Sequence, residues 1–115
     1  FMKIQMTNQG DVSVVELEGE LDFHSSPELR SRLGELASKQ APKILIDLKK
    51  VGYMDSSGIA TFVEAFQKTK RYHGRLILAD LTPAVRGIFE IAKLESIFEI
   101  ATDQDEAMNR FAGKN

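Results

Sequence analysis

Two neighbouring segments decide the fold class of this chain: Ile44–Leu48 (ILIDL) and Tyr53–Ile59 (YMDSSGI). The first is a short and almost wholly apolar run, which is typical of a strand buried on both faces of a sheet. The second leads into a segment whose apolar side chains recur with the period of a helix, at Ile59, Phe62, Val63 and Phe66. We therefore expect a strand, a loop that carries two serines, and a helix that reaches about Tyr72.

On the N-terminal side, the pattern predicts a hairpin followed by a helix. Two β-type runs, Lys3–Thr7 and Val12–Glu18, flank four residues that accept turn conformations at little steric cost. Ser25 or Ser26 can cap the helix, because Pro27 follows directly and suits the first helical turn. The leucines beyond this point recur at helical spacing.

On the C-terminal side, strands and helices alternate. Arg75–Ala79 is another buried-type strand, and Gly74 before it is expected to end the preceding helix. Thr82 caps a third helix, Ser96–Ala101 forms the last strand, and Asp103 opens the last helix. Strands that alternate with helices imply right-handed crossovers. The predicted fold is a single α/β domain in which a mixed, mostly parallel sheet carries an N-terminal antiparallel hairpin and about four helices.

Composition excludes several classes of protein. The 115 residues, of which 43% are hydrophobic, suffice for one core, and we expect one domain over residues 2–115 with Met2 as the native start and Phe1 as an extra residue. A net charge of −2 gives no nucleic-acid-binding footprint. No segment approaches the roughly 20 apolar residues that a bilayer requires, and cysteine is absent. We expect a cytoplasmic protein with no membrane insertion and no direct contact with nucleic acid.

The loop with two serines admits three chemical interpretations. Ser56 or Ser57 can simply cap the helix, with Asp55 favourable beside the positive end of the helix dipole, and the local pattern favours this. Either serine can instead accept a phosphoryl group, since neither has the Glu or Gln three residues later that closes a capping box. Ser57 can also be a nucleophile with His24 and Asp22, but the Gly-x-Ser-x-Gly elbow of hydrolases is absent.

Motifs for cofactors and metal ions are missing from the sequence. Neither of the glycine-rich phosphate-binding motifs, Gly-x-x-x-x-Gly-Lys-Ser/Thr and Gly-x-Gly-x-x-Gly, occurs in the sequence. The only histidines, His24 and His73, belong to no cluster with metal-ligand spacing. We expect no cofactor, no metal ion and no enzymatic activity.

Four segments together carry a family resemblance: Gly19–Asp22 (GELD), Ile46–Leu48 (IDL), Met54–Ile59 (MDSSGI) and Ala84–Phe89 (AVRGIF). In this order they resemble a STAS domain of the bacterial anti-sigma factor antagonist type, over about residues 3–111. The Asp-Ser-Ser-Gly element is short, but its place after Ile-Asp-Leu and before the apolar helix makes the combination specific.

The resemblance implies a regulatory protein that is phosphorylated on the second serine of the pair by a partner anti-sigma factor that is itself a serine kinase. In that family the unphosphorylated antagonist binds the anti-sigma factor and frees the sigma factor, and a phosphatase reverses the modification. Carried over to this chain, the phosphorylated residue is Ser57, and the partner surface comprises Asp22, Asp55, Ser56, Ser57 and Gly58.

The resemblance also allows a second hypothesis about function, and one residue of this chain departs from the family pattern. STAS domains also occur in transporter-associated subunits and in stress-complex scaffolds, so a non-catalytic scaffold that is never phosphorylated is the second hypothesis. Lys93 stands where relatives often have glycine after the third helix, and the turn before Leu94 is expected to differ for that reason.

Overall fold

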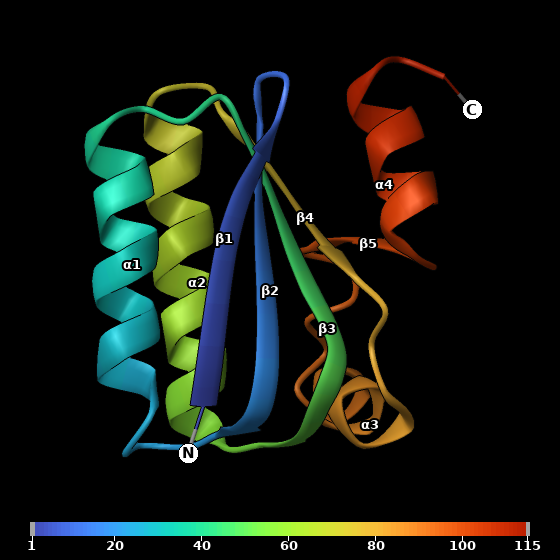
Figure 1. Ribbon diagram of the computed structural model, residues 1–115. Helices are drawn as coiled ribbons and strands as arrows, with labels where there is room; N and C mark the ends of the chain where they lie inside the picture. The colour runs from blue at the N-terminus through green and yellow to red at the C-terminus, as the bar shows by residue number, and fades with distance from the viewer. Residues whose placement is uncertain (1, 115) are drawn as a thin grey trace.

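The computed structural model describes residues 2–114, which form a five-stranded sheet with four helices packed around it (Figure 1). Phe1, which was expected to be an extra residue, lies outside the described residues. The strands are arranged in chain order and comprise β1 (Met2–Gln9), β2 (Val12–Leu21), β3 (Lys43–Met54), β4 (Arg75–Ala79) and β5 (Glu99–Ala101). β1 pairs antiparallel with β2, and all later pairs are parallel. The predicted mixed sheet with an N-terminal hairpin is confirmed.

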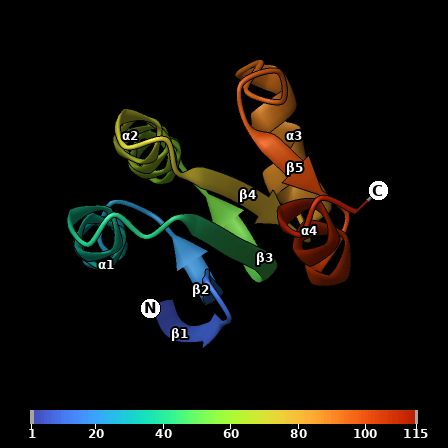
Figure 2. The same ribbon diagram turned by 90° about the horizontal axis from the view of Figure 1, so that it is seen from above.

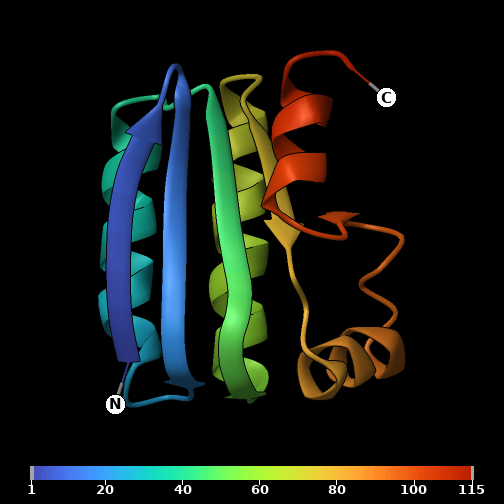
Figure 3. The ribbon, with the colours of Figure 1, turned by 45° about the vertical axis from the view of Figure 1, so that its right-hand side comes forward.

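The helices cover the sheet on both sides. Helices α1 (Ser26–Ser38) and α2 (Ser56–Arg71) lie side by side on one face, and both run from the same edge of the sheet (Figures 1 and 2). Helix α4 (Gln104–Phe111) packs on the opposite face, and α3 (Pro83–Ile91) lies beyond the end of β4 (Figure 3). The first residues of α1 and α2 are therefore neighbours.

The central strand β3 explains how one apolar run holds both layers. Ile44, Ile46 and Leu48 belong to the core beneath α1 and α2, whereas Leu45 belongs to the core beneath α4. This alternation follows from the two-residue period of a strand. Asp47 is the polar exception: it is only 6% exposed, and its carboxylate accepts hydrogen bonds from the Gln104 side chain and the Lys49 backbone.

Several strands differ in length from the sequence prediction. β2 continues to Leu21 and β3 to Met54, because two register shifts keep these strands paired beyond Glu16. The last strand is shorter than predicted. Ser96–Phe98 form a turn in which the backbone N–H groups of Ile97 and Phe98 both bond to the carbonyl oxygen of Leu94, at 3.0 Å each, and these groups cannot pair with β4.

Helices α2 and α3 end at residues in the left-handed conformation. Gly74 was expected to end α2, but the left-handed residue is His73, with a φ of 64°, and Gly74 N–H closes the turn on the carbonyl of Thr69. Lys93 takes the same role after α3, with a φ of 57°, and Leu94 N–H bonds to the carbonyl of Phe89. Lysine at this position thus leaves the hydrogen bonds of the turn in place, although its side chain disfavours that conformation.

Candidate functional site

The two serines lie at the edge of the sheet where β2 and β3 end and where α1 and α2 begin. Leu21 and Met54 are partners at the ends of these strands, and the Asp55 N–H donates to the Leu21 carbonyl at 3.1 Å. A methyl group on Gly58 would lie 2.7 Å from Met54 Cγ and 2.9 Å from Leu21 Cγ. Gly58 therefore lets α2 start directly against the strand ends, and it is buried beneath the surface on which it was expected.

Asp55, and neither of the serines, caps helix α2. Its carboxylate accepts hydrogen bonds from the backbone N–H groups of Ser57, at 2.9 Å, and Gly58, at 3.4 Å. The interpretation of Ser56 or Ser57 as the cap is wrong, because an aspartate one residue earlier satisfies the same donors equally well. Both serine hydroxyls are thereby released from a capping role.

The Ser57 hydroxyl sits in a short chain of hydrogen bonds. It donates to Asp55 Oδ1 at 2.5 Å and accepts a hydrogen bond of 3.3 Å from the Ser26 hydroxyl. Ser26 is the first residue of α1 and is only 5% exposed, whereas Ser57 is partly exposed and Ser56 is exposed. Two helix N-termini, each with partial positive charge, therefore meet at one hydroxyl.

The carboxylates of the site are held in their ionised form. The Ser57 hydroxyl lowers the pKa of Asp55, and the backbone N–H groups of Ser57, Gly58 and Phe23 add to that effect. The pKa of Asp22 is also lowered, chiefly by the backbone N–H of Ser25, which donates to its carboxylate at 3.0 Å. At neutral pH the edge thus presents two negative charges, of which Asp55 is in direct contact with Ser57.

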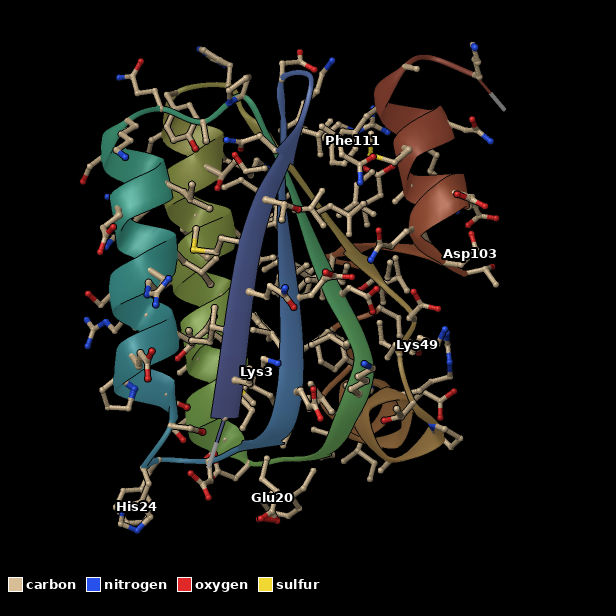
Figure 4. All side chains as sticks on the ribbon, viewed as in Figure 1. Lys3, Glu20, His24, Lys49, Asp103 and Phe111 are labelled. Atoms are coloured by element: carbon tan, nitrogen blue, oxygen red, sulfur yellow. The ribbon has the colours of Figure 1, made fainter. Side chains whose placement is uncertain are left out.

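The structure does not assemble the hydrolase arrangement. His24 is exposed and points away from the molecule below α1 (Figure 4). The Asp22 carboxylate binds the backbone N–H groups of His24 and Ser25, and the hydroxyl of Ser57 is bonded to Ser26 and Asp55. The hydrogen bonds found in residues 2–114 therefore connect Ser57 to no imidazole.

Two aromatic residues at this edge were not predicted as site residues from the sequence. Phe23 is 66% exposed and stacks on the His24 ring, with 4.1 Å between ring centroids, and Tyr53 at the end of β3 is 49% exposed. Phe23 and Ser57 line the same end of a groove between α1 and α2. Exposed aromatic side chains are frequent anchors of protein interfaces. The available signal was a phenylalanine in the polar loop after Leu21.

The part of the chain that the structure describes, residues 2–114, has neither a candidate metal site nor a candidate membrane span. No group of three or more His, Cys, Asp or Glu side chains is placed to hold a metal ion. None of the helices described is both long and apolar enough to cross a bilayer.

Comparisons with known proteins place this geometry in a family. The chain is 37% identical to the anti-sigma-B factor antagonist of Bacillus subtilis over 98 residues, which cover 85% of this chain and 88% of the relative. An anti-sigma factor antagonist from Mycobacterium paratuberculosis superposes with a TM-score of 0.89 at 24% identity, over 96% of this chain and 93% of that one.

A further similar structure is that of a phosphorylated protein. The Bacillus cell fate determinant SpoIIAA in its phosphorylated form is 26% identical, with a TM-score of 0.75, over 95% of this chain and 99% of that one. The family model of the STAS domain matches residues 3–107. The chain therefore belongs to the STAS domain family.

Proposed function

We propose that this protein is an anti-sigma factor antagonist whose unphosphorylated form binds an anti-sigma factor serine kinase, and that phosphorylation of Ser57 ends the binding. The observation that carries the proposal is the Ser57 hydroxyl, which lies beyond the cap, partly exposed and in contact with an ionised carboxylate. A relative with 37% identity is named an anti-sigma-B factor antagonist, and one with 26% identity is known in a phosphorylated form.

The partner surface of this proposal is the edge around Ser57. Asp22, Asp55, Ser56 and Ser57 form its polar part, and Gly58 supports it from beneath. Phe23 and Tyr53 add exposed apolar area on the same edge. Binding of the kinase here frees the sigma factor, and a phosphatase restores the binding form.

The fold should survive the modification. A phosphoryl group adds about −1.5 to −2 units of charge at neutral pH. It is placed at the second residue of α2 and beside the first residue of α1. Negative charge at a helix N-terminus is favourable by about 0.3–1 kcal/mol, and this offsets part of the repulsion from Asp55.

Binding to the partner should not survive it. After phosphorylation the Ser57 oxygen no longer donates to Asp55, and the phosphoryl group adds to the negative charge already present on that carboxylate. A partner surface that matches the unmodified edge then meets an unbalanced charge, which costs several kcal/mol at an interface. Since each 1.4 kcal/mol is about tenfold in affinity, release follows without any refolding.

Calorimetric titration of an anti-sigma factor kinase with variants at Ser57 tests the proposal. Ser57→Ala is expected to bind as tightly as the unmodified protein, and Ser57→Asp about tenfold more weakly or worse. Ser38→Ala and Ser38→Asp are the matched controls, because Ser38 is an exposed serine at the opposite end of α1 and lies outside the proposed partner surface. Equal affinities of Ser57→Ala and Ser57→Asp would refute the switch.

Intact mass measurement after incubation with the kinase and ATP tests the modification itself. Unmodified protein is expected to gain one phosphoryl group, and Ser57→Ala none. A non-catalytic scaffold or a transporter-associated subunit predicts no gain in mass for either protein, so this result separates the two hypotheses.

A further inference from the structure

We propose that Ser26 is a positioning residue for the phosphorylation of Ser57, orienting the hydroxyl before transfer and binding the phosphoryl group afterwards. The inference rests on the proposed function, since it concerns the same modification. It assigns a role to a residue on a different helix, 31 positions away in the chain, whose side chain contacts Ser57.

Ser26 is held in place by its surroundings. The residue is only 5% exposed, and its backbone N–H donates to the carbonyl of Asp22 at 2.8 Å. Pro27, the residue after Ser26, has a backbone conformation that suits the first turn of α1. The Ser26 hydroxyl, at 3.3 Å from Ser57 Oγ, therefore has little freedom to turn elsewhere.

The hydrogen bonds give the Ser57 hydroxyl a definite direction. Each serine hydroxyl has one proton and two acceptor lone pairs. Ser26 uses its proton on Ser57, and Ser57 uses its own on Asp55. One lone pair of Ser57 Oγ is left over, and it faces neither of these neighbours. That lone pair is the one available to attack phosphorus.

The phosphoryl group comes from ATP that the partner kinase holds. Ser57 Oγ forms a bond to the terminal phosphorus of ATP held by the partner kinase, and ADP leaves with the electron pair of the broken P–O bond. The Ser57 proton passes along its existing hydrogen bond to Asp55 and then to water.

The same contact serves the product. The ester oxygen of phosphoserine donates no proton, and Asp55 repels the added charge. Ser26 and Ser57 both line the groove between α1 and α2, so the phosphoryl group has open space on the side of Ser26. The Ser26 hydroxyl can then donate to a phosphoryl oxygen. Such a donor favours the dianion and lowers the pKa of the second phosphate ionisation.

The first test uses protein made with phosphoserine at position 57, so that it needs no kinase. Phosphorus NMR titration is expected to give a phosphate pKa about half a unit higher in Ser26→Ala than in the parent. Ser26→Thr, which restores a hydroxyl, is expected to return the value to that of the parent. Ser31→Ala is the matched control, since Ser31 is exposed on the same groove. An unchanged pKa in Ser26→Ala would overturn the proposal.

The second test follows phosphorylation kinetics. With a kinase that modifies the parent protein, Ser26→Ala is expected to lower kcat about fivefold while KM stays the same, and Ser26→Thr to restore kcat. A merely structural role would raise KM or melt the protein, and either outcome would count against positioning. Absence of phosphorylation in the parent would refute the proposed function, while the NMR titration would still judge Ser26.

Discussion

Two strand-to-helix junctions lie at the same edge of the sheet, and they use their hydroxyls differently. At the start of α3, Thr82 is itself the cap: its side chain accepts from Val85 N–H at 3.4 Å and donates to the Val51 carbonyl at 2.8 Å. At the start of α2 the cap is Asp55, and the hydroxyl of Ser57 comes after it. The hydroxyl of Thr82 is therefore committed to its cap, whereas the hydroxyl of Ser57 is not.

The largest effect on stability is expected from glycines in the two helices. A methyl group on Gly58 would lie 2.7 Å from Met54 Cγ, whereas one on Gly87 in α3 would have no atom within 4 Å. Gly58→Ala should therefore lower the free energy of unfolding by about 1–3 kcal/mol. Gly87→Ala should raise it by up to about 1 kcal/mol, because alanine favours the helix. Urea unfolding curves with a common slope give both values.

This pair tests whether α2 is seated directly against the ends of β2 and β3. A loss for Gly87→Ala as large as that for Gly58→Ala would mean that close packing is no special property of the junction before Ser57. A gain in both would mean that Leu21 and Met54 yield easily to the added carbon.

The next effect is expected at the two caps. Asp55→Ala and Thr82→Ala should each cost about 0.5–2 kcal/mol, since each leaves backbone donors unpaired. Asp55→Asn should recover most of the first loss, because asparagine is also a good cap. Chemical denaturation at neutral pH measures all three changes.

The caps should differ in their response to acid. The pKa of Asp55 is lowered in the folded protein, mainly by the Ser57 hydroxyl. Its contribution is therefore complete above the unfolded-state pKa of about 3.9 and is lost as the pH falls through the lower folded value. The stability advantage of the parent over Asp55→Asn should shrink in that window, whereas the loss in Thr82→Ala should be independent of pH. A constant advantage would mean that the carboxylate charge does not contribute.

The sequence predicted those features that depend on residues close together in the chain. The apolar run at Ile44–Leu48 and the helical period after Ile59 indicated β3 and α2, and the structure has both. Asp55 and Ser57 were placed at one junction because they are two residues apart.

Other features depend on contacts that local pattern does not record. Ser26 meets Ser57 only because α1 and α2 start at the same edge of the sheet. The predicted cap of α2 was Ser56 or Ser57, and Asp55 takes that place because aspartate caps a helix as well as serine does. Ile97 and Phe98 looked like strand residues by composition, yet their N–H groups close a turn on Leu94. Each of these outcomes was set by three-dimensional packing.

The smallest effect is expected at the other ends of the two helices. His73 after α2 and Lys93 after α3 both have positive φ values, of 64° and 57°, which glycine adopts without a steric penalty. The left-handed conformation costs a residue with a side chain about 1–2 kcal/mol, and the greater freedom of glycine in the unfolded chain offsets about 0.5–1 kcal/mol of the relief. Lys93→Gly and His73→Gly should each stabilise the protein by a few tenths of a kcal/mol to about 1 kcal/mol, which calorimetry detects as a rise of a few degrees in Tm.

Lys93→Ala separates the effect of the backbone from the effect of the charge, because it removes the ammonium group but keeps the Cβ. Stabilisation by alanine as large as that by glycine would show that the lysine charge, and not the backbone, limits the stability of this turn.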